Sequence, residues 1–436
     1  MKTPKDKDYG RAPTAFLYRW IAIPLLLPLV ARFFRLRARA DKRLADLEGP
    51  IVAIGHHTSY LDQFAMAKLF GRRRVNFVGG AFLFKNPSVA SLFKRLGVIP
   101  KTQFRSDSTA LKSMLKVMKR GGVLGIFPEA TRSLDGTTIA FDDALARLIK
   151  KSNSAVVVIR IYGGYSTWPR WSKSGIRKGY AEGQVHKILT VAEVQSLSAG
   201  ELQEFLQGAM AYNEYDWLRE NPHEYKSKAI AAGVENVAFL CPACLRSDRM
   251  RSSGDRLFCE ACGNAARMTA QGFFVPASEG AKVFADLHQW VSWEREWMRE
   301  RVSHEDLDLA ADVVLCQLDE EEKYRVTGKG RVRFSGSKIV YEGVACELAD
   351  GIVLNKKLKK AVKAEKGEGG LSESFFDGFP VAEKSFDVTK MRGMVSQYGE
   401  YFELIEPGGQ VNRFFPEDKQ IVLPIQMMML SRKEQA

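Results

Sequence analysis

The chain has 436 residues, of which 45% are hydrophobic, so a chain without a core is excluded and two or three folded domains are expected. Its formal net charge of +14 at pH 7 predicts an anionic partner, either nucleic acid or an anionic membrane surface. Residues 1–43 contain eleven Lys or Arg and three Asp, a net charge of +8, and they flank the most apolar stretch of the chain. This combination favours the membrane surface.

The apolar stretch covers residues 20–31 and reads WIAIPLLLPLVA. It is shorter than the roughly 20 residues that an upright helix needs to cross a bilayer, and Pro24 and Pro28 are expected to kink it. A signal peptide is not expected, because residues 32–35 (RFFR) stand where small residues would mark a cleavage site. We predict that residues 1–45 form an interfacial or re-entrant membrane anchor, with Trp20 and the arginines at headgroup level. The alternative is a buried helix at the edge of the next domain.

Strand-like and helix-like segments alternate in the part that follows. Strands are expected at 51–54, 75–78, 98–99, 122–127 and 155–161, and helices at 61–70, 88–96 and 142–151. A further helix follows Ser106 or Asp107, either of which can cap it. The pattern continues through a strand at 189–191 and a helix that starts near Ser198. This alternation predicts an α/β domain over residues 46–225.

The second half of the chain differs in kind. Four cysteines lie within a small domain expected over 236–272, and residues 279–303 have the apolar face of an amphipathic helix. Residues 305–436 read as strands between Gly-rich turns, which predicts a small antiparallel β domain that loosely resembles pleckstrin-homology-like modules. Within it, the Lys-rich stretch 356–370 is expected to be flexible. Its lysines either contact anionic lipid or form a solvated loop.

Two polar clusters follow two of the expected strands. The first, GHHTSYLD at 55–62, contains His57 and Asp62, and the second, FPEATRS at 127–133, contains Glu129, Thr131 and Arg132. Histidine can take a proton near neutral pH when a carboxylate holds its ring in one tautomer. Because α/β folds build active sites at strand ends, the two clusters predict a base-activated hydroxyl beside an anion pocket.

The first cluster resembles the H-x-x-x-x-D box of the glycerolipid acyltransferases, the lysophosphatidate and glycerol-3-phosphate acyltransferase superfamily. The second is similar to their F-P-E-G-T-R-S signature, with Ala130 in place of Gly. The two stand in the right order and at a normal interval, and the resemblance covers roughly residues 40–215. It implies an α/β fold with a mixed sheet flanked by helices.

The resemblance also implies roles for these residues. His57 would be the general base that deprotonates an acceptor hydroxyl, and Asp62 would orient its ring. His56 is a neighbouring candidate, but the family spacing selects His57. Glu129 and Arg132 would help to hold the phosphate and glycerol of the acceptor, with Thr131 as a hydroxyl donor. A salt bridge between Arg132 and Glu129 is the alternative for that pair.

Two further family blocks are altered in this chain. Residues 97–105 resemble the G-x-x-F-I-x-R block, whose Arg binds phosphate, but Gln103 stands where that Arg is expected. Lys101 or Arg105 could supply the cation instead, and the sequence leaves this choice open. In the fourth block Arg160 replaces a proline. These departures leave the identity of the acceptor more open than the reaction type.

Cys241, Cys244, Cys259 and Cys262 form two C-x-x-C knuckles, which is the spacing of a tetrahedral zinc site. Because four thiolates fill every position, the expected zinc ribbon is structural. The rival interpretation is a pair of disulfides, which needs an oxidising compartment. Cys316 and Cys346 are expected to be ordinary apolar residues. Zinc ribbons can bind nucleic acid, but acidic residues offset the arginines at 246–256, so this function is disfavoured.

We therefore predict a membrane-associated, bacterial acyltransferase of phospholipid biosynthesis. It would transfer a fatty acyl group from acyl-CoA or acyl-carrier protein to the hydroxyl of a lysophospholipid, foremost 1-acylglycerol-3-phosphate. It would lie at the cytoplasmic face of the cell membrane as a peripheral or monotopic protein, in contact with membrane phospholipids. The alternatives are a non-catalytic lipid-binding scaffold and a zinc-ribbon protein that binds nucleic acid.

Overall fold

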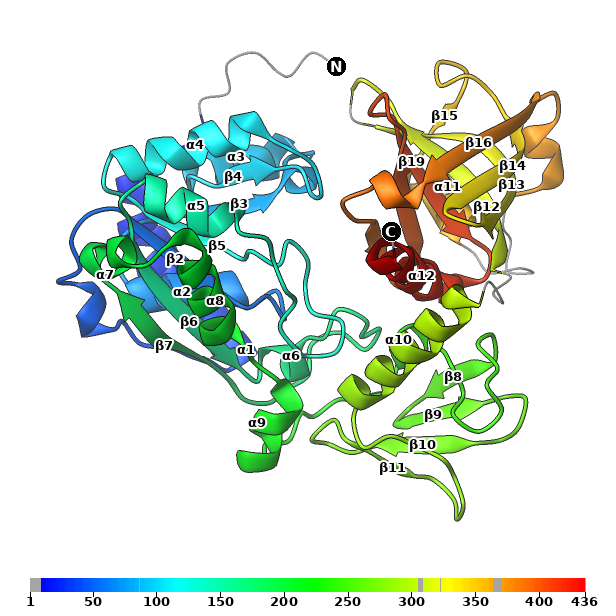
Figure 1. Cartoon of the computed structure of the whole chain (residues 1–436), viewed down its shortest axis with the longest axis horizontal. Coiled ribbons are helices and arrows are strands. Elements are labelled where there is room, and N and C mark those ends of the chain that lie inside the picture. Colours follow the sequence, from blue (N-terminus) through cyan, green and yellow to red (C-terminus); the bar gives the residue numbers. More distant parts are fainter. Residues whose placement is uncertain (1–8, 86, 305–308, 322, 364–370, 436) are drawn as a thin grey trace. The chain divides into compact units, whose positions relative to one another are not determined.

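The computed structural model describes residues 9–85, 87–304, 309–321, 323–363 and 371–435. These residues form two compact units (Figure 1). The first unit holds the described residues up to Ile230 together with Met268–Phe273. The second holds Ala231–Arg267 and the described residues from Phe274 onward.

A seven-stranded sheet with the order β1-β7-β6-β2-β5-β3-β4 forms the centre of the first unit. Its strands are β1 (Leu36–Arg37), β2 (Ile51–Gly55), β3 (Val75–Gly80), β4 (Ile99–Lys101), β5 (Val123–Ile126), β6 (Ala155–Tyr162) and β7 (Ala181–Leu189). Neighbouring strands are parallel except β6 and β7, so the sheet is mixed, as expected. The strand expected at 189–191 is instead β7, which ends at Leu189 because Thr190 caps the following helix.

Helices cover both faces of this sheet (Figure 1). They include α2 (Asp62–Phe70), α4 (Ser108–Lys119), α5 (Ala144–Lys151), α7 (Val191–Ser196) and α8 (Ala199–Met210). The unit also contains α3 (Pro87–Arg95), α6 (Gly164–Thr167) and α9 (Glu214–Glu220). Successive strand side chains point to opposite faces, so Ile51 packs with α2 while Val52 packs with α4, α5 and α8. Asp107, one of the two expected capping residues, caps α4, and Ser198 caps α8 at the expected helix start.

The N-terminal apolar segment is one continuous helix. A π-helical stretch, η1 (Leu17–Leu26), passes directly into α1 (Leu27–Phe34). Pro24 lies inside the π-helical part, where the altered hydrogen-bond pattern accommodates a residue without a backbone N–H. By length and composition Leu17–Phe34 is able to cross a membrane, and only 17% of it is buried. The helix is therefore longer than the apolar run that the sequence outlined.

The second unit begins with a four-stranded sheet in the order β11-β10-β9-β8. Its strands are β8 (Met250–Ser253), β9 (Arg256–Cys259), β10 (Ala265–Met268) and β11 (Phe274–Pro276). Helix α10 (Leu287–Ser303) follows, and the expected start at residue 279 is wrong. Gly280 has a left-handed φ of 74°, and the Asp286 side chain accepts a hydrogen bond from the backbone N–H of Gln289, which fixes the helix start.

The rest of the second unit is an antiparallel β domain that ends in α12 (Val422–Gln435). Its strands are β12 (Ala310–Leu318), β13 (Tyr324–Ser335), β14 (Lys338–Ala345), β15 (Ile352–Val353), β16 (Val381–Asp387), β17 (Val395–Gln397), β18 (Tyr401–Ile405) and β19 (Val411–Pro416). The order is β16-β14-β13-β12-β19-β18-β17, with β15 paired to β13. The expected flexible stretch is wrong for 356–363, where Leu358 and Val362 seat α11 (Lys356–Lys363) on the core. Residues 364–370 lie outside the described residues.

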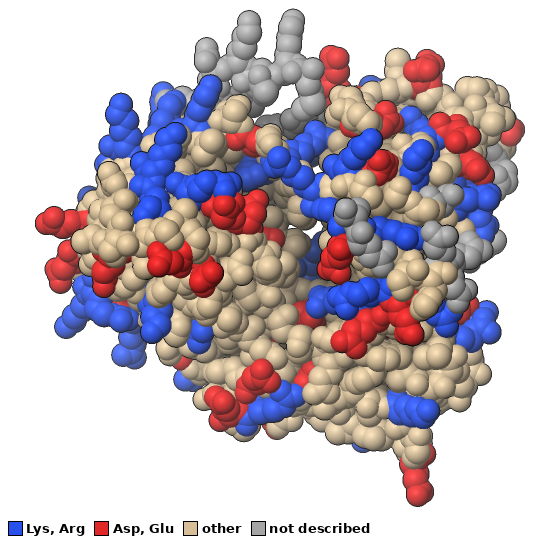
Figure 2. Space-filling model, viewed as in Figure 1, with Lys and Arg blue, Asp and Glu red and all other residues tan. Residues whose placement is uncertain are grey.

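Positive charge is concentrated in the part of the chain that forms the first unit. Residues 1–230 contain 37 Lys or Arg and 19 Asp or Glu, a net charge of +18, whereas residues 231–436 contain 28 and 32, a net charge of −4. On the face seen in Figure 2, Lys and Arg gather where α3 and α4 lie. An anionic partner is therefore expected to contact the first unit.

Candidate active site

The two polar clusters meet at one edge of the mixed sheet. Strands β2 and β5 are parallel neighbours, with Ile51 paired to Val123, so the loops after them leave the sheet side by side. The backbone N–H of Ser133 donates to the carbonyl oxygen of His57 at 2.7 Å. This bond ties the 127–133 loop directly to the loop that carries the histidine.

His57 and Asp62 form a close pair at this edge. The Nδ1 atom of His57 lies 2.7 Å from Oδ2 of Asp62, and the ring stacks on Phe127 with centroids 4.7 Å apart. The Nε2 atom has no hydrogen-bond partner among the described residues, and the side chain is 23% exposed. The carboxylate therefore fixes the ring with its second nitrogen open to a substrate.

Asp62 is itself held rigidly. It lies at the first position of α2 and is fully buried. Its Oδ2 atom also accepts hydrogen bonds from the backbone N–H groups of Thr58 and Ser59, at 2.8 and 3.0 Å. Its Oδ1 atom accepts one from the Ser59 hydroxyl at 2.9 Å. The tight turn after β2 thus brings together two residues that would lie on different faces of a regular helix.

Glu129 is buried beneath the pair and does not form an ion pair with Arg132. Its Oε1 atom accepts the backbone N–H of His57 at 2.9 Å, and its Oε2 atom accepts that of Ile139 at 3.0 Å. Burial raises the pKa of Glu129 to about 8, and the two hydrogen bonds oppose this rise. The side chain thus holds the loops in place.

Changing Glu129→Gln is expected to lower the free energy of unfolding by about 1–3 kcal/mol, because the amide replaces one acceptor oxygen with an NH₂ group that faces a buried backbone N–H. Urea unfolding monitored by tryptophan fluorescence measures this. The exposed Glu220→Gln serves as a control with the same replacement of a carboxyl by an amide group. A Glu129→Gln variant as stable as that control would contradict this bracing role.

His56, the neighbouring candidate, is fully buried. Its Nε2 atom lies 3.0 Å from the carbonyl oxygen of Ile161, and its ring stacks on Tyr212 with centroids 4.5 Å apart. Burial lowers the pKa of His56 to about 4. The ring is therefore neutral at pH 7 and closed to a substrate, so the geometry favours His57 over His56 as the accessible imidazole.

The depressed pKa of His56 gives a testable pH dependence. The unfolded chain binds a proton at this histidine below pH 6.5 while the folded chain does not, so stability falls as the pH drops from 6.5 towards 4. Between pH 7 and pH 5 the expected loss from this group is about 2 kcal/mol. We expect His56→Gln to lose less stability than the wild type over this interval in urea unfolding, and equal losses would contradict the assignment.

An arginine pair lies beside the histidine. Arg132 stacks on the Tyr60 ring at 3.7 Å and donates to the Tyr60 hydroxyl at 2.8 Å, while its Nη1 atom is buried without a hydrogen-bond partner. Burial lowers the pKa of Arg132 to about 10, which leaves it a cation at pH 7. Arg170 donates to the Thr131 hydroxyl at 2.8 Å. No sequence motif indicated Arg170, because it lies after α6, outside both polar clusters.

The loop after β4 contacts the second cluster through Gln103. The Gln103 amide donates to the Ala130 carbonyl at 2.7 Å. The Lys101 ammonium lies 3.3 Å from the carbonyl oxygens of Thr102 and Arg105, so Lys101 is turned to its own loop. Gln103 thus joins the two loops, and the choice between Lys101 and Arg105 as the phosphate-binding cation stays a prediction.

Ala130 has a φ of 59°, in the left-handed region that favours glycine. The F-P-E-G-T-R-S signature has Gly at this position, and the left-handed backbone explains why Gly is favoured there. Ala130→Gly is expected to raise the free energy of unfolding by up to about 1 kcal/mol, since relief of this strain exceeds the added entropy of the unfolded glycine. Thermal unfolding of the variant measures the effect, and a lower unfolding temperature would refute the explanation.

Comparisons with known proteins agree with this geometry. Residues 35–162 match the family described as Acyltransferase. Over 157 residues, 36% of this chain, it is 26% identical to the chloroplastic 1-acyl-sn-glycerol-3-phosphate acyltransferase LPAT1 of Arabidopsis thaliana. It is 28% identical over 161 residues to a 1-acyl-sn-glycerol-3-phosphate acyltransferase of Chlamydomonas reinhardtii. Residues 35–162 thus correspond to an acyltransferase domain.

The matches cover only part of these proteins. The chain spans 44% of the Arabidopsis relative and 48% of the Chlamydomonas relative. The crystal structure of the 1-acyl-sn-glycerophosphate (LPA) acyltransferase PlsC from Thermotoga maritima aligns with 48% of this chain and 86% of that chain. It does so at 19% identity and a TM-score of 0.37, a likeness that carries no conclusion of its own. The acyltransferase domain is thus assigned from the family match and the relatives.

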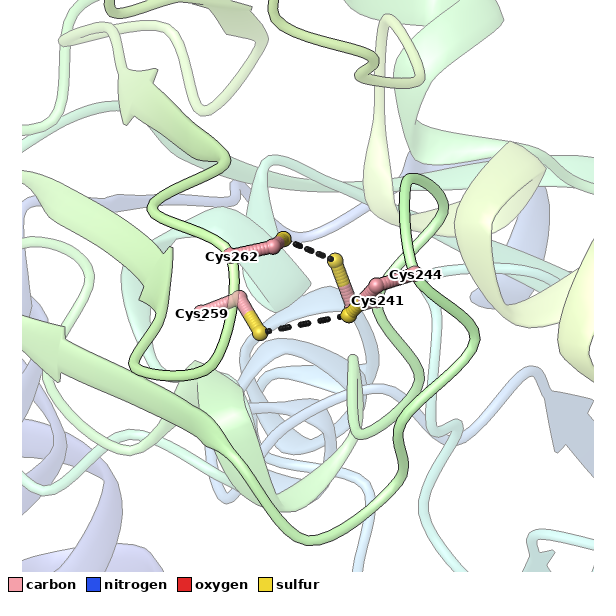
Figure 3. Close-up of side chains that lie close together, drawn as sticks. All are labelled: Cys241, Cys244, Cys259 and Cys262. Carbon is pink, nitrogen blue, oxygen red and sulfur yellow. Dashed lines mark hydrogen bonds between the residues drawn. The ribbon is translucent and has the colours of Figure 1, made fainter.

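The four knuckle cysteines converge outside the acyltransferase domain, in the second unit (Figure 3). All four Sγ atoms lie within 4.8 Å of one another, with Cys241 and Cys262 3.6 Å apart and Cys244 and Cys259 3.7 Å apart. Four thiolates around a tetrahedral zinc with bonds of about 2.3 Å would lie about 3.8 Å apart. The cluster thus fits a zinc ion, and its separations are too long for disulfide bonds.

The two knuckles have the same backbone form. In each, the residue after the second cysteine has a left-handed φ, 59° at Leu245 and 75° at Gly263. Its N–H donates to the carbonyl of the first cysteine of that knuckle, at 2.9 and 3.0 Å. Buried Glu294 of α10 accepts the N–H of Leu240 at 2.8 Å and so holds the segment that enters the first knuckle. Sequence spacing gave no indication of Glu294.

Proposed function

We propose that this protein transfers a fatty acyl group to the hydroxyl of a lysophospholipid, with His57 as the general base. The main support is the His57–Asp62 pair, in which the buried carboxylate lies 2.7 Å from Nδ1 while Nε2 is left open. The acyltransferase relatives support the reaction class. A non-catalytic scaffold would not need a partly exposed imidazole fixed in this way.

The proposed reaction takes place in two steps without a covalent enzyme intermediate. His57 Nε2 takes the proton of the acceptor hydroxyl as its oxygen bonds to the thioester carbonyl carbon, and Asp62 stabilises the imidazolium. The tetrahedral intermediate then expels the thiolate of the donor. The thiolate takes the proton from Nε2, which restores the neutral ring. The products are the ester and the free thiol of coenzyme A or of acyl-carrier protein.

We infer that Arg132 and Arg170 bind the phosphate of the acceptor, foremost 1-acylglycerol-3-phosphate. Arg132 has a buried Nη1 donor without a partner, and Arg170 lies beside it through Thr131. Two guanidinium groups at one place suit a dianionic phosphate, which can accept hydrogen bonds from both. Glu129 then acts as a positioning residue, because both of its oxygens are bonded to backbone N–H groups.

The cysteine cluster, the N-terminal helix and the C-terminal β domain are each assigned a supporting role. We propose that the four cysteines hold a structural zinc, since a closed four-sulfur site leaves no position for a substrate. The helix Leu17–Phe34 would lie in the interface of the membrane at its cytoplasmic face, with its exposed apolar side in lipid. The described residues from Ala310 onward would form the pleckstrin-homology-like module, a meander of strands followed by a C-terminal helix.

Purified protein tested with a labelled acyl donor against a panel of acceptors decides the proposal. We expect transfer to 1-acylglycerol-3-phosphate, and a large rise in KM when Arg132→Ala removes half of the phosphate site. Arg39→Ala, an exposed arginine outside the site, is the matched control. Transfer only to acceptors that lack phosphate would refute the acceptor, and parallel reactions with acyl-CoA and acyl-carrier protein identify the donor.

A further inference from the structure

Two cavities meet at the C-terminal end of the N-terminal helix, away from the His57 cluster. One, of about 520 Å³, is lined by Pro28, Ala31, Arg32, Arg35, Leu36, Arg37 and Lys68. The other, of about 260 Å³, is lined by Arg35, Arg37, Gly179, Tyr180, His223 and Glu224. They share Arg35 and Arg37, and the larger falls in the usual size range of small-ligand sites, about 300–1,000 Å³. No residue of the His57 cluster lines either cavity.

The cations here lack acidic partners. Within the described residues, no carboxylate forms an ion pair with Arg32, Arg35, Arg37 or Lys68. Arg37 lies over the Tyr180 ring at 4.9 Å, and Tyr180 in turn stacks on His223 at 4.1 Å. Glu224 is the one carboxylate that lines the smaller cavity. Four cations around connected cavities thus have an excess of positive charge that suits an anion.

The backbone holds these cations together. Arg35 caps α1 in a left-handed conformation, with φ 54°, and this turn directs the chain into β1. Strand β1 pairs with β7, which places Arg37 opposite Glu182 at the sheet edge. Lys68 comes from the last turn of α2. Three different elements therefore contribute, and the cations are not a run along one solvated helix face.

The anion site is continuous with an apolar surface. Leu25, Leu29 and Phe33 are 57%, 65% and 70% exposed and recur every four residues, so they form one stripe along the helix. Arg32 lies in the turn where this stripe ends, and Pro28 and Ala31 of the same helix line the larger cavity. A ligand in this place would meet cations on one side and exposed hydrocarbon on the other. That is the chemistry of a phospholipid at the membrane interface.

We propose that Arg32, Arg35, Arg37 and Lys68 bind the phosphate of an anionic membrane phospholipid at a site separate from the His57 centre. The lipid would anchor the end of the N-terminal helix and orient the acyltransferase domain on the bilayer. This inference rests on the membrane association proposed above, but not on the chemistry of His57.

Vesicle flotation of the full-length, zinc-loaded protein tests the site. The vesicles contain phosphatidylcholine alone or mixed with phosphatidylglycerol. The site variant is Arg35→Gln with Arg37→Gln, which keeps the Cβ of Arg35 and hence its backbone strain. The control is Arg39→Gln with Lys42→Gln, two exposed nearby residues that line neither cavity, with the same change in charge. Lys68→Gln, on a different element, replaces the double variant if the latter does not fold, as judged by thermal unfolding.

We expect the wild type to prefer the anionic vesicles. Each Lys or Arg in contact with an anionic surface contributes a factor of about five to partitioning, so the site variant should lose about 30-fold, Lys68→Gln about fivefold, and the control pair less than fivefold. Equal losses of vesicle binding in the two double variants would overturn the proposal, because they would indicate attraction by the overall positive charge and not by a defined site. Tight binding of inorganic phosphate without vesicles would also overturn it, in favour of a soluble anion.

Acyl transfer measured in detergent micelles separates this site from the proposed function. There the site variant should retain the wild-type rate, since its residues do not line the His57 centre. Protein without transferase activity that still shows the vesicle preference would refute the reaction while supporting the lipid site. An active enzyme that shows no preference for anionic vesicles would support the proposed reaction and refute the lipid site.

Discussion

Replacing His57 with alanine is expected to lower kcat/KM for acyl transfer by about 10²–10⁴-fold or more, because no other side chain of the cluster can take the hydroxyl proton. His56 cannot replace it, since its ring is buried and its pKa is lowered to about 4. The rate of thiol release from a labelled acyl donor measures the effect. Full activity of His57→Ala would eliminate the proposed base.

Two further variants show whether the loss comes from the base itself. Asp62→Asn removes the negative charge that stabilises the imidazolium, while its amide oxygen can keep the place of Oδ2 beside Nδ1, so a loss of rate of up to about 10⁴-fold is expected. His56→Gln changes the adjacent imidazole and should leave the rate close to that of the wild type. A loss in His56→Gln as large as in His57→Ala would indicate that the loop, and not the base, had been damaged.

Removal of the proposed zinc is expected to have the second large effect. A structural zinc in four thiolates contributes about 10–16 kcal/mol to folding, so a strong chelator is expected to unfold the ribbon around β8 to β11. Metal analysis should give one zinc per chain, and circular dichroism with limited proteolysis should detect the unfolding. The α/β core of the acyltransferase domain is formed by other residues and should persist.

Cysteine variants provide the control for this experiment. Cys241→Ser removes one ligand and should abolish zinc binding, whereas Cys346→Ser alters a cysteine outside the cluster and should retain it. A Cys241→Ser protein with bound zinc and unchanged proteolysis would refute the metal site. Thiols that react only after reduction would instead favour the disulfide interpretation.

The same variants test the nucleic-acid alternative. A zinc-ribbon protein that binds DNA or RNA would do so with strong salt dependence, and Cys241→Ser would abolish binding. The charge distribution speaks against it, since residues 231–436 have a net charge of −4 while residues 1–230 have +18. Surface arginines of the ribbon are also engaged, as Arg251 with Glu260 at 3.3 Å and Arg267 with Asp255 at 3.2 Å. Anionic lipid at the first unit is the better expectation.

The sequence predicted most of the α/β domain because its strands are apolar runs with short polar connections. The strands at 51–54 and 155–161 are confirmed, since all their residues except Arg160 are buried and apolar. The errors fall where a local turn overrides periodicity. Helix α10 begins at Leu287 because Asp286 caps it, and α11 forms within a supposed flexible stretch because Val362 packs on the β core.

Sequence by itself determined the partners that lie close along the chain: His57 with Asp62, and the two cysteine knuckles. Short spacing limits the arrangements available, and these residue types have few other uses together. Only the tertiary structure decided that Glu129 supports the His57 loop, that Arg170 lies beside Thr131, and that Arg35 and Lys68 share a cavity. Those contacts join residues 33 to 72 positions apart. Their geometry follows from the order of strands in the sheet, which no local pattern in the sequence specifies.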